Sequence, residues 1–160
     1  MKHPQVIYLL FFSFLLMSLN VIAQASSASN PNYDSTLARQ LGADEYGMKQ
    51  YVLVILKTGP NKTSDKTFIS KQFKGHMENI DRLVKEKRLI VAGPLKKNDK
   101  TYRGIFILDN VKGTEEAAEL LQTDPAIKAG LLEPELFIWY GSAALPVYLE
   151  ASDKVWRSSP

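Results

Sequence analysis

The chain has 160 residues, which suffice for one folded domain and hardly for two. It contains no cysteine, which excludes disulfide bonds and a cysteine-linked lipid anchor, so the core alone must hold the fold together. Lys and Arg number 20 against 17 Asp and Glu, and they are scattered along the chain rather than gathered as a nucleic-acid-binding face requires. We therefore expect no nucleic acid among its partners.

The first residues differ in kind from the rest. After Lys2 no charged side chain occurs until Asp34, and residues 6–17 are apolar apart from Ser13. The run is short for a membrane span, which needs about 20 apolar residues, and small residues follow it. This pattern is typical of a secretory signal peptide. We expect a signal peptide over residues 1–23, export to the periplasm or the medium, and no membrane attachment after cleavage; the alternative is an uncleaved membrane helix.

Residues 24–49 connect this segment to the periodic part of the chain. Their first part is rich in Ser, Ala and Asn and has little to bury. The spacing of Leu37, Leu41 and Tyr46 predicts a short helix over residues 36–48. We therefore expect a leader that is flexible or briefly helical.

The folded domain is expected over residues 50–141, followed by a tail over residues 142–160. Short β-rich runs that end at turn residues alternate in it with segments of helical periodicity. The order strand, helix, strand, strand, helix, strand predicts a ferredoxin-like α+β fold, an antiparallel four-stranded sheet with both helices on one face. The predicted elements are a strand at 51–56, a helix at 67–88, strands at 89–92 and 102–108, a helix at 114–122, a helical turn or loop at 124–130, and a strand at 136–140.

Both faces of the predicted sheet are apolar. Alternate side chains of residues 51–56 point to opposite faces, and all six are apolar. An antiparallel sheet with one face in water normally alternates apolar and polar residues, and the two helices can cover only one face. We expect a second copy of the chain to cover the other face in a homodimer, because closed two-fold dimers are the commonest assembly. The alternative is that the tail after Gly141 folds back over it, through Leu145, Val147, Tyr148 and Leu149.

His76 is the only histidine after the predicted signal peptide. It lies between Phe73 and Ile80 in the first predicted helix, where spacings of three and four residues put it on or beside the apolar stripe. An imidazole that faces an apolar cleft can accept a proton from a substrate. The alternative is a histidine that only packs or caps at the edge of the core.

Asp124-Pro125 also has two interpretations. Asp at the N-cap followed by Pro at the first helical position is a common helix start. A carboxylate beside His76 would instead hold the imidazole in one tautomer, although the sequence alone does not bring the two residues together. One histidine without cysteine cannot form a zinc site, and we expect neither a metal nor a cofactor.

Several short motifs in a fixed order resemble the YciI-like (YCII-related) family over residues 51–140. The resemblance implies a ferredoxin-like dimeric α+β barrel with a histidine and an aspartate in a cleft, here His76 and Asp124. Some relatives are dehydrochlorinases of chlorinated aromatic breakdown products, related barrels include muconolactone isomerases, and most members have no known reaction. This chain differs in its small Ala126 and its predicted export signal. The motifs are His76-Met77, Arg82-Leu83, Gly93-Pro94-Leu95, Tyr102-Arg103-Gly104-Ile105, Asp124-Pro125 and Ala129-Gly130.

Three functions fit these features. The first is an enzyme of lyase or isomerase type, in which His76 is a general base that Asp124 orients. The second is a non-catalytic dimer that binds an unknown small molecule. The third is an exported domain that binds another protein, since one fold can carry many functions.

Overall fold

The structure, a computed structural model, describes residues 30–157, and the predicted signal peptide over residues 1–23 lies outside them. The chain divides into two units, Met1–Asp34 and Ser35–Pro160. In the described part of the first unit, the Tyr33 N–H donates to the Asn30 carbonyl over 3.1 Å. The sheet and the helices belong to the second unit. No helix within residues 30–157 is long and apolar enough to span a membrane.

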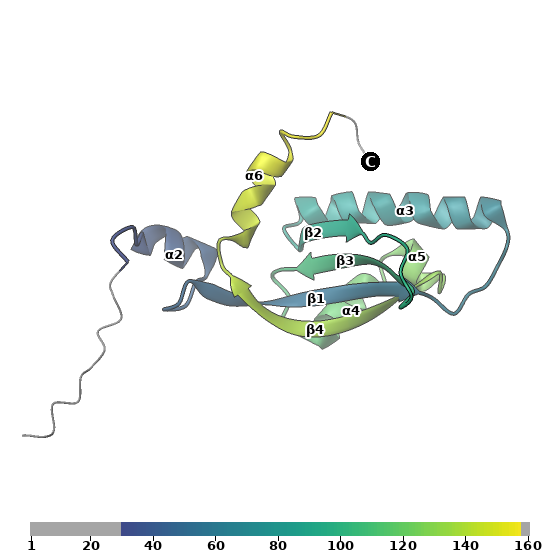
Figure 1. Ribbon diagram of the computed structural model, residues 1–160, viewed down its shortest axis with the longest axis horizontal. Coiled ribbons are helices and arrows are strands. Elements are labelled where there is room, and N and C mark those ends of the chain that lie inside the picture. Colours follow the sequence, from purple (N-terminus) through teal and green to yellow (C-terminus); the bar gives the residue numbers. More distant parts are fainter. Residues whose placement is uncertain (1–29, 158–160) are drawn as a thin grey trace, which may run out of the picture. The chain divides into compact units, whose positions relative to one another are not determined.

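The second unit has an α+β fold with a four-stranded antiparallel sheet (Figure 1). The strand order is β2-β3-β1-β4, which confirms the predicted ferredoxin-like arrangement. The elements are α2 (Ser35–Leu41), β1 (Met48–Thr58), α3 (Lys66–Lys85), β2 (Leu89–Pro94), β3 (Tyr102–Leu108), α4 (Thr114–Leu121), α5 (Pro125–Lys128), β4 (Leu132–Ser142), the 3-10 helix η1 (Leu145–Tyr148) and α6 (Leu149–Ser152).

Helix α2 is shorter than predicted. It ends at Leu41, and Gly42 follows with a φ of 72°, a left-handed conformation that favours glycine. The Asp44 carboxylate then accepts hydrogen bonds from the backbone N–H groups of Tyr46 and Met48, over 2.9 and 3.0 Å. The prediction of a helix as far as residue 48 is wrong, because these turn contacts satisfy the backbone without a helix.

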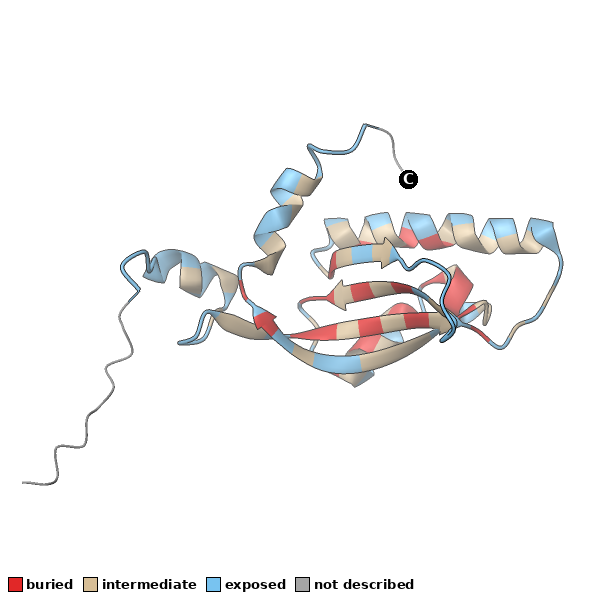
Figure 2. Cartoon of the chain, in the orientation of Figure 1, coloured by how far each residue is buried: buried red, intermediate tan, exposed pale blue. Residues whose placement is uncertain are grey.

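The core lies between the sheet and its helices. Val52 and Val54 of β1 are fully buried and pair in register with Leu108 and Phe106 of β3. These side chains form one cluster with residues of α3 and α4, including Leu83. Figure 2 shows buried positions recurring along β1 and β3, as expected where one face of each strand meets the core.

The opposite face of the sheet is also apolar but remains partly exposed. Leu53 of β1 pairs with Ile107 of β3 and with Phe137 of β4, so the three side chains share this face. Phe137 is 46% exposed. The tail reaches β2 through the Tyr148 hydroxyl, which donates a hydrogen bond to the Ile90 carbonyl over 2.6 Å. The tail therefore contacts β2 and leaves Phe137 half exposed.

Candidate active site

Helix α3 holds His76 between two aromatic rings. The helix begins at a defined cap, where the Asp65 side chain accepts a hydrogen bond from the Phe68 N–H over 3.0 Å. The Phe73 ring meets the imidazole edge-on at 5.9 Å, and the Phe106 ring stacks on it at 5.8 Å. The His76 side chain is only 10% exposed. These contacts fix the plane of the imidazole within the fold.

Asp124 is fully buried at the start of α5. One carboxylate oxygen, Oδ1, accepts hydrogen bonds from the backbone N–H groups of Ala126 and Ile127, over 2.9 and 3.3 Å. Pro125 occupies the first turn, where the lack of an N–H costs nothing. The predicted helix start at Asp124-Pro125 is therefore present.

The second carboxylate oxygen contacts the histidine. Asp124 Oδ2 lies 2.6 Å from His76 Nδ1, a distance typical of a strong hydrogen bond. Asp124 accepts two backbone N–H groups, as an ionised carboxylate does, and such a carboxylate can only accept hydrogen bonds. His76 Nδ1 is therefore the protonated nitrogen, and its N–H donates a hydrogen bond to Oδ2. In this tautomer Nε2 has a free lone pair. Both positions that the sequence suggested for Asp124 are thus occupied: Oδ1 lies at the start of α5, and Oδ2 lies beside His76.

Gly75 explains how two residues 48 positions apart can meet. A Cβ atom at Gly75 would lie 2.7 Å from Cγ of Pro125, closer than such atoms approach in proteins. Only glycine therefore lets α3 approach α5 at this point, and His76 and Asp124 are the adjacent residues. The sequence reasoning missed this position, although a glycine inside a helical pattern was the available signal.

Asn79 is a second residue that the sequence reasoning missed. It is 6% exposed, and its amide nitrogen lies 3.5 Å from Asp124 Oδ2, a long contact. Its amide oxygen accepts from Arg82 Nη2 over 2.8 Å, which directs the NH2 group toward the carboxylate. Asn79 follows His76 by three residues, so both face Asp124 from the same side of α3. The signal in the sequence was a polar residue next to the apolar stripe.

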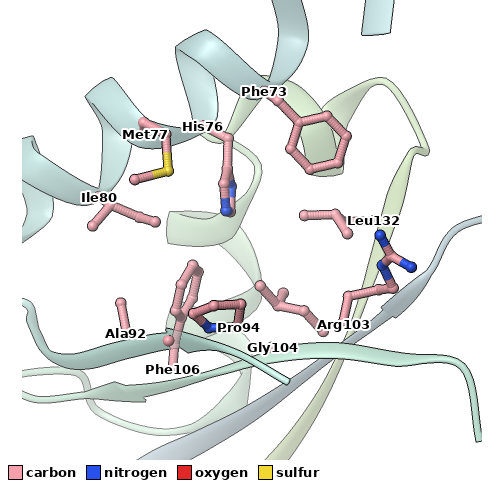
Figure 3. Close-up of a pocket in the computed structure, with 12 residues that line it drawn as sticks. Phe73, His76, Met77, Ile80, Ala92, Pro94, Arg103, Gly104, Phe106 and Leu132 are labelled. Carbon is pink, nitrogen blue, oxygen red and sulfur yellow. The ribbon is translucent and has the colours of Figure 1, made fainter. Parts of the chain in front are cut away.

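A cavity of about 430 Å³ adjoins the imidazole (Figure 3). Figure 3 shows the His76 ring pointing from α3 into this space. The only ionisable side chains in its wall are His76 and Arg103, so the wall is otherwise apolar or backbone. The remaining lining residues are Leu56, Phe73, Met77, Ile80, Ala92, Gly93, Pro94, Gly104, Phe106 and Leu132.

These groups are chemically capable of acid–base catalysis. The imidazole can take up a proton through Nε2, while the carboxylate behind it stabilises the resulting cation. Within residues 30–157 no group of three or more His, Cys, Asp or Glu side chains is placed to hold a metal ion. The fold and the site define a small α+β domain with a buried His-Asp pair at the wall of an apolar cavity.

Comparison with known proteins identifies the family. Residues 50–138 match the model of the YCII-related domain, and the chain belongs to this family. It is 32% identical over 92 residues to the uncharacterized protein YjpA of Bacillus subtilis (strain 168), an alignment that covers 58% of this chain and 95% of that protein. A structure of 5-chloro-2-hydroxyhydroquinone dehydrochlorinase (TftG) from Burkholderia phenoliruptrix AC1100, in complex with 2,5-dihydroxybenzoquinone, is similar at a TM-score of 0.39 and 21% identity, covering 55% of this chain and 92% of that chain.

Proposed function

We propose that this protein is a small-molecule enzyme of lyase or isomerase type, with His76 as the general base and Asp124 as the group that orients it. The observation that carries the proposal is the 2.6 Å contact between His76 Nδ1 and Asp124 Oδ2, beside a cavity that the same imidazole lines. A histidine that only packed would need neither a buried carboxylate behind it nor an open space before it.

The proposed step is removal of a proton from carbon. Nε2 of His76 accepts a proton from a C–H bond next to a carbonyl, and the bonding electron pair moves to the carbonyl oxygen. The Nδ1–H of the imidazolium stays bound to Asp124, which offsets the new positive charge. In an isomerase, an enolate conjugated with a C=C bond then takes the proton back from His76 at the far end of the conjugated system. In a lyase, the enolate instead expels a leaving group from the adjacent carbon with its electron pair, and the proton on His76 passes to the leaving group or to water. General base catalysis of this kind contributes about 10²- to 10⁴-fold.

The cavity favours a small and largely apolar substrate. Its volume of about 430 Å³ lies near the lower end of the range of ligand pockets, about 300–1,000 Å³. Apolar walls favour the hydrocarbon part of a ligand, and His76 is the only base among the lining side chains. A molecule of one or two rings that carries an acidic C–H bond matches these properties.

Exchange of carbon-bound hydrogen tests this proposal. The probe is 2-tetralone, a neutral bicyclic ketone whose protons beside the carbonyl exchange for deuterium in D2O, followed by NMR. The protein is expected to accelerate this exchange, and His76→Ala to reduce the acceleration about 100-fold or more. Lys74→Ala is the matched control, because Lys74 lies on the same helix with its side chain 80% exposed.

The same assay separates catalysis from binding alone. If 2-tetralone binds but the wild-type protein does not accelerate its exchange, the catalytic proposal fails and a non-catalytic binding protein is favoured. If Lys74→Ala loses as much activity as His76→Ala, the loss reflects a disturbed helix, and the assigned role of His76 is wrong.

We further propose that the protein is a homodimer that pairs through the partly exposed sheet face. The proposal is supported by the shared apolar face of Leu53, Ile107 and Phe137, and by the 46% exposure of Phe137. Burial of apolar surface stabilises by about 25 cal/mol per Å², which favours association. Sedimentation velocity is expected to show a dimer for the wild type and a monomer for Phe137→Glu. Val155→Glu, at a side chain that is 82% exposed in the tail, should remain dimeric, and a wild-type monomer would contradict the proposal.

We also propose that the protein is exported. The support is the apolar run over residues 6–17, which lacks charge and is followed by small residues. Mass spectrometry of the protein recovered outside the cytoplasm is expected to show a chain that lacks about the first 23 residues. An intact N-terminus on protein from that fraction would contradict cleavage.

A further inference from the structure

Arg103 is the one cationic side chain among the residues that line the His76 cavity. Within the described part of the chain, no hydrogen bond or ion pair occupies its guanidinium group. Two other arginines are paired, Arg82 with Glu86 at 2.9 Å and Arg88 with Glu116 at 2.6 Å. Arg103 thus presents a guanidinium with open donor sites beside an apolar space.

A β-bulge accounts for the position of this side chain. Leu56 of β1 pairs with Gly104 of β3, but the next residue, Lys57, pairs with Tyr102, so Arg103 is the extra residue between two pairs. A bulge bends the strand and redirects one side chain, and bulges are frequent next to active sites. Figure 3 shows the Arg103 side chain rising from β3 beside Leu132 at the edge of the cavity.

Gly104, next to Arg103, lines the cavity with backbone alone. It faces the helices, as its buried neighbour two residues on, Phe106, also does. A Cβ atom at Gly104 would lie 2.8 Å from the carbonyl oxygen of Gly93, so no side chain fits there. The strand edge therefore combines a redirected cation with a position that has no side chain.

The surrounding hairpin is also basic. Residues 95–103 contain Lys96, Lys97, Lys100 and Arg103, against the single acid Asp99. The hairpin follows Pro94, which itself lines the cavity. Clustered positive charge raises the local concentration of anions and speeds their arrival.

We propose that Arg103 binds the carboxylate of the substrate, so that the substrate is a small acid with an apolar ring-sized body. The planar guanidinium matches a carboxylate through two parallel N–H···O bonds. Arg103 is exposed, so the ion pair keeps part of its hydration at the mouth while the apolar body enters the cavity toward His76. The assignment rests on the proposed function only in taking this cavity as the substrate site.

Binding of two matched probes to the full-length protein tests the assignment. Isothermal titration calorimetry compares 2-naphthoate with its neutral amide, 2-naphthamide, which have the same ring system. The wild type is expected to bind the carboxylate about tenfold more tightly than the amide, as suits one charge-assisted contact at a partly hydrated site. Arg103→Gln should abolish this preference. Lys100→Gln, which removes one charge from the same hairpin but lies outside the cavity wall, should keep it.

The outcomes separate this inference from the catalytic proposal. Equal affinity of the wild type for both probes, no binding of 2-naphthoate, or a preference that survives Arg103→Gln would each overturn the role of Arg103. His76→Ala should keep the preference, because the carboxylate contact does not involve the imidazole. If the preference depends on Arg103 while the wild type does not accelerate 2-tetralone exchange, the proposed catalysis fails and the anion site stands.

Discussion

Two carboxylates, Asp124 and Asp109, each hold a basic side chain from a distant part of the chain, and the two pairs differ in the groups that they leave unused. Asp124 Oδ2 lies 2.6 Å from His76 Nδ1, and Asp109 Oδ2 lies 2.8 Å from Lys49 Nζ. Both pairs are largely buried, with side-chain exposures of 10% and 0% in the first and 18% and 8% in the second. Each also adjoins a cavity, of about 430 Å³ for His76 and about 410 Å³ for Lys49.

The two pairs differ in whether the basic side chain keeps a lone pair that can accept a proton. The ammonium of Lys49 has donors only, and it also lies 5.1 Å from the centre of the Tyr51 ring. Asp109 Oδ1 accepts the backbone N–H of Asn110 over 2.8 Å. Each Asp109 oxygen therefore already accepts one hydrogen bond, and the Lys49 ammonium offers no lone pair to the second cavity. His76, in contrast, uses one ring nitrogen for Asp124 and keeps the lone pair of the other. A buried pair beside a cavity is thus a candidate for general base catalysis when its basic side chain keeps an unused acceptor, as the His76 imidazole does and the Lys49 ammonium does not.

The largest expected effect comes from changing the Asp124 carboxylate to an amide. In Asp124→Asn the side-chain oxygen can still cap α5, but its NH2 group then faces His76, which favours the tautomer with the proton on Nε2. The rate of 2-tetralone exchange is expected to fall about 10²- to 10⁴-fold. Imidazole ¹⁵N chemical shifts should show that the proton has moved between the ring nitrogens.

Asp109→Asn is the control in the other pair. It removes the charge opposite Lys49 and is expected to leave the exchange rate unchanged, because neither residue lines the His76 cavity. Equal loss of exchange in both variants would show that the two pairs do not differ as described.

The next effect in size is a loss of stability, with no effect expected on the exchange rate. Lys49→Met removes one partner and leaves the Asp109 carboxylate, 8% exposed, without its counter-charge. The free energy of unfolding is expected to fall by about 3 kcal/mol, the lower end for a broken buried pair, because Lys49 is partly hydrated. Urea denaturation measures the change. A variant of unchanged stability would mean that the ion pair contributes little, as many exposed pairs do.

A smaller loss is expected from the glycine that lets α3 approach α5. Gly75→Ala places a Cβ 2.7 Å from the Pro125 ring, and overpacking of this kind costs about 1–3 kcal/mol. The shift of α3 should also lengthen the His76–Asp124 contact and slow 2-tetralone exchange. Gly93→Ala is the control for stability, since a Cβ there meets nothing within 4 Å. If Gly75→Ala is as stable and as active as the wild type, close packing at this point is not required.

Most of the sheet was predictable from local patterns, and the misses have identifiable causes. The predicted and observed bounds of β3 agree, because its apolar run ends at turn residues on both sides. The prediction for β4 began at residue 136, whereas the strand begins at Leu132. The first part of this strand is not apparent from the sequence, because it contains Pro134 and the flanking Glu133 and Glu135, which are unfavourable in a strand. They fit because β4 is an edge strand and Lys57 of β1 lies 3.8 Å from each glutamate.

The site was predictable residue by residue but not as an arrangement. His76 and Asp124 could be singled out by residue type and by their neighbours in the sequence, Phe73 for His76 and Pro125 for Asp124. Their contact depends on the approach of α3 to α5, which no local spacing encodes. The bulge at Arg103 depends likewise on the register between β1 and β3, which is a property of the folded sheet.

The smallest effect at neutral pH is expected in the response of the Lys49 region to alkali. Burial raises the pKa of Tyr51 from 10.0 to about 12, and the charge of Asp109 acts in the same direction. A raised pKa means that the folded state holds the phenol proton more tightly than the unfolded state. This contribution to stability is therefore complete below pH 10 and is lost as the pH rises from about 10 to about 12.

In Tyr51→Phe, the decline in the free energy of unfolding over that range should be shallower than in the wild type. The hydrogen bond with Asp44 raises the pKa of Tyr140 to about 12 as well, so Tyr140→Phe must be measured in parallel to separate the two slopes. If Tyr51→Phe leaves the slope unchanged, neither burial nor the charge of Asp109 raises the pKa of this phenol, and the expectation is wrong.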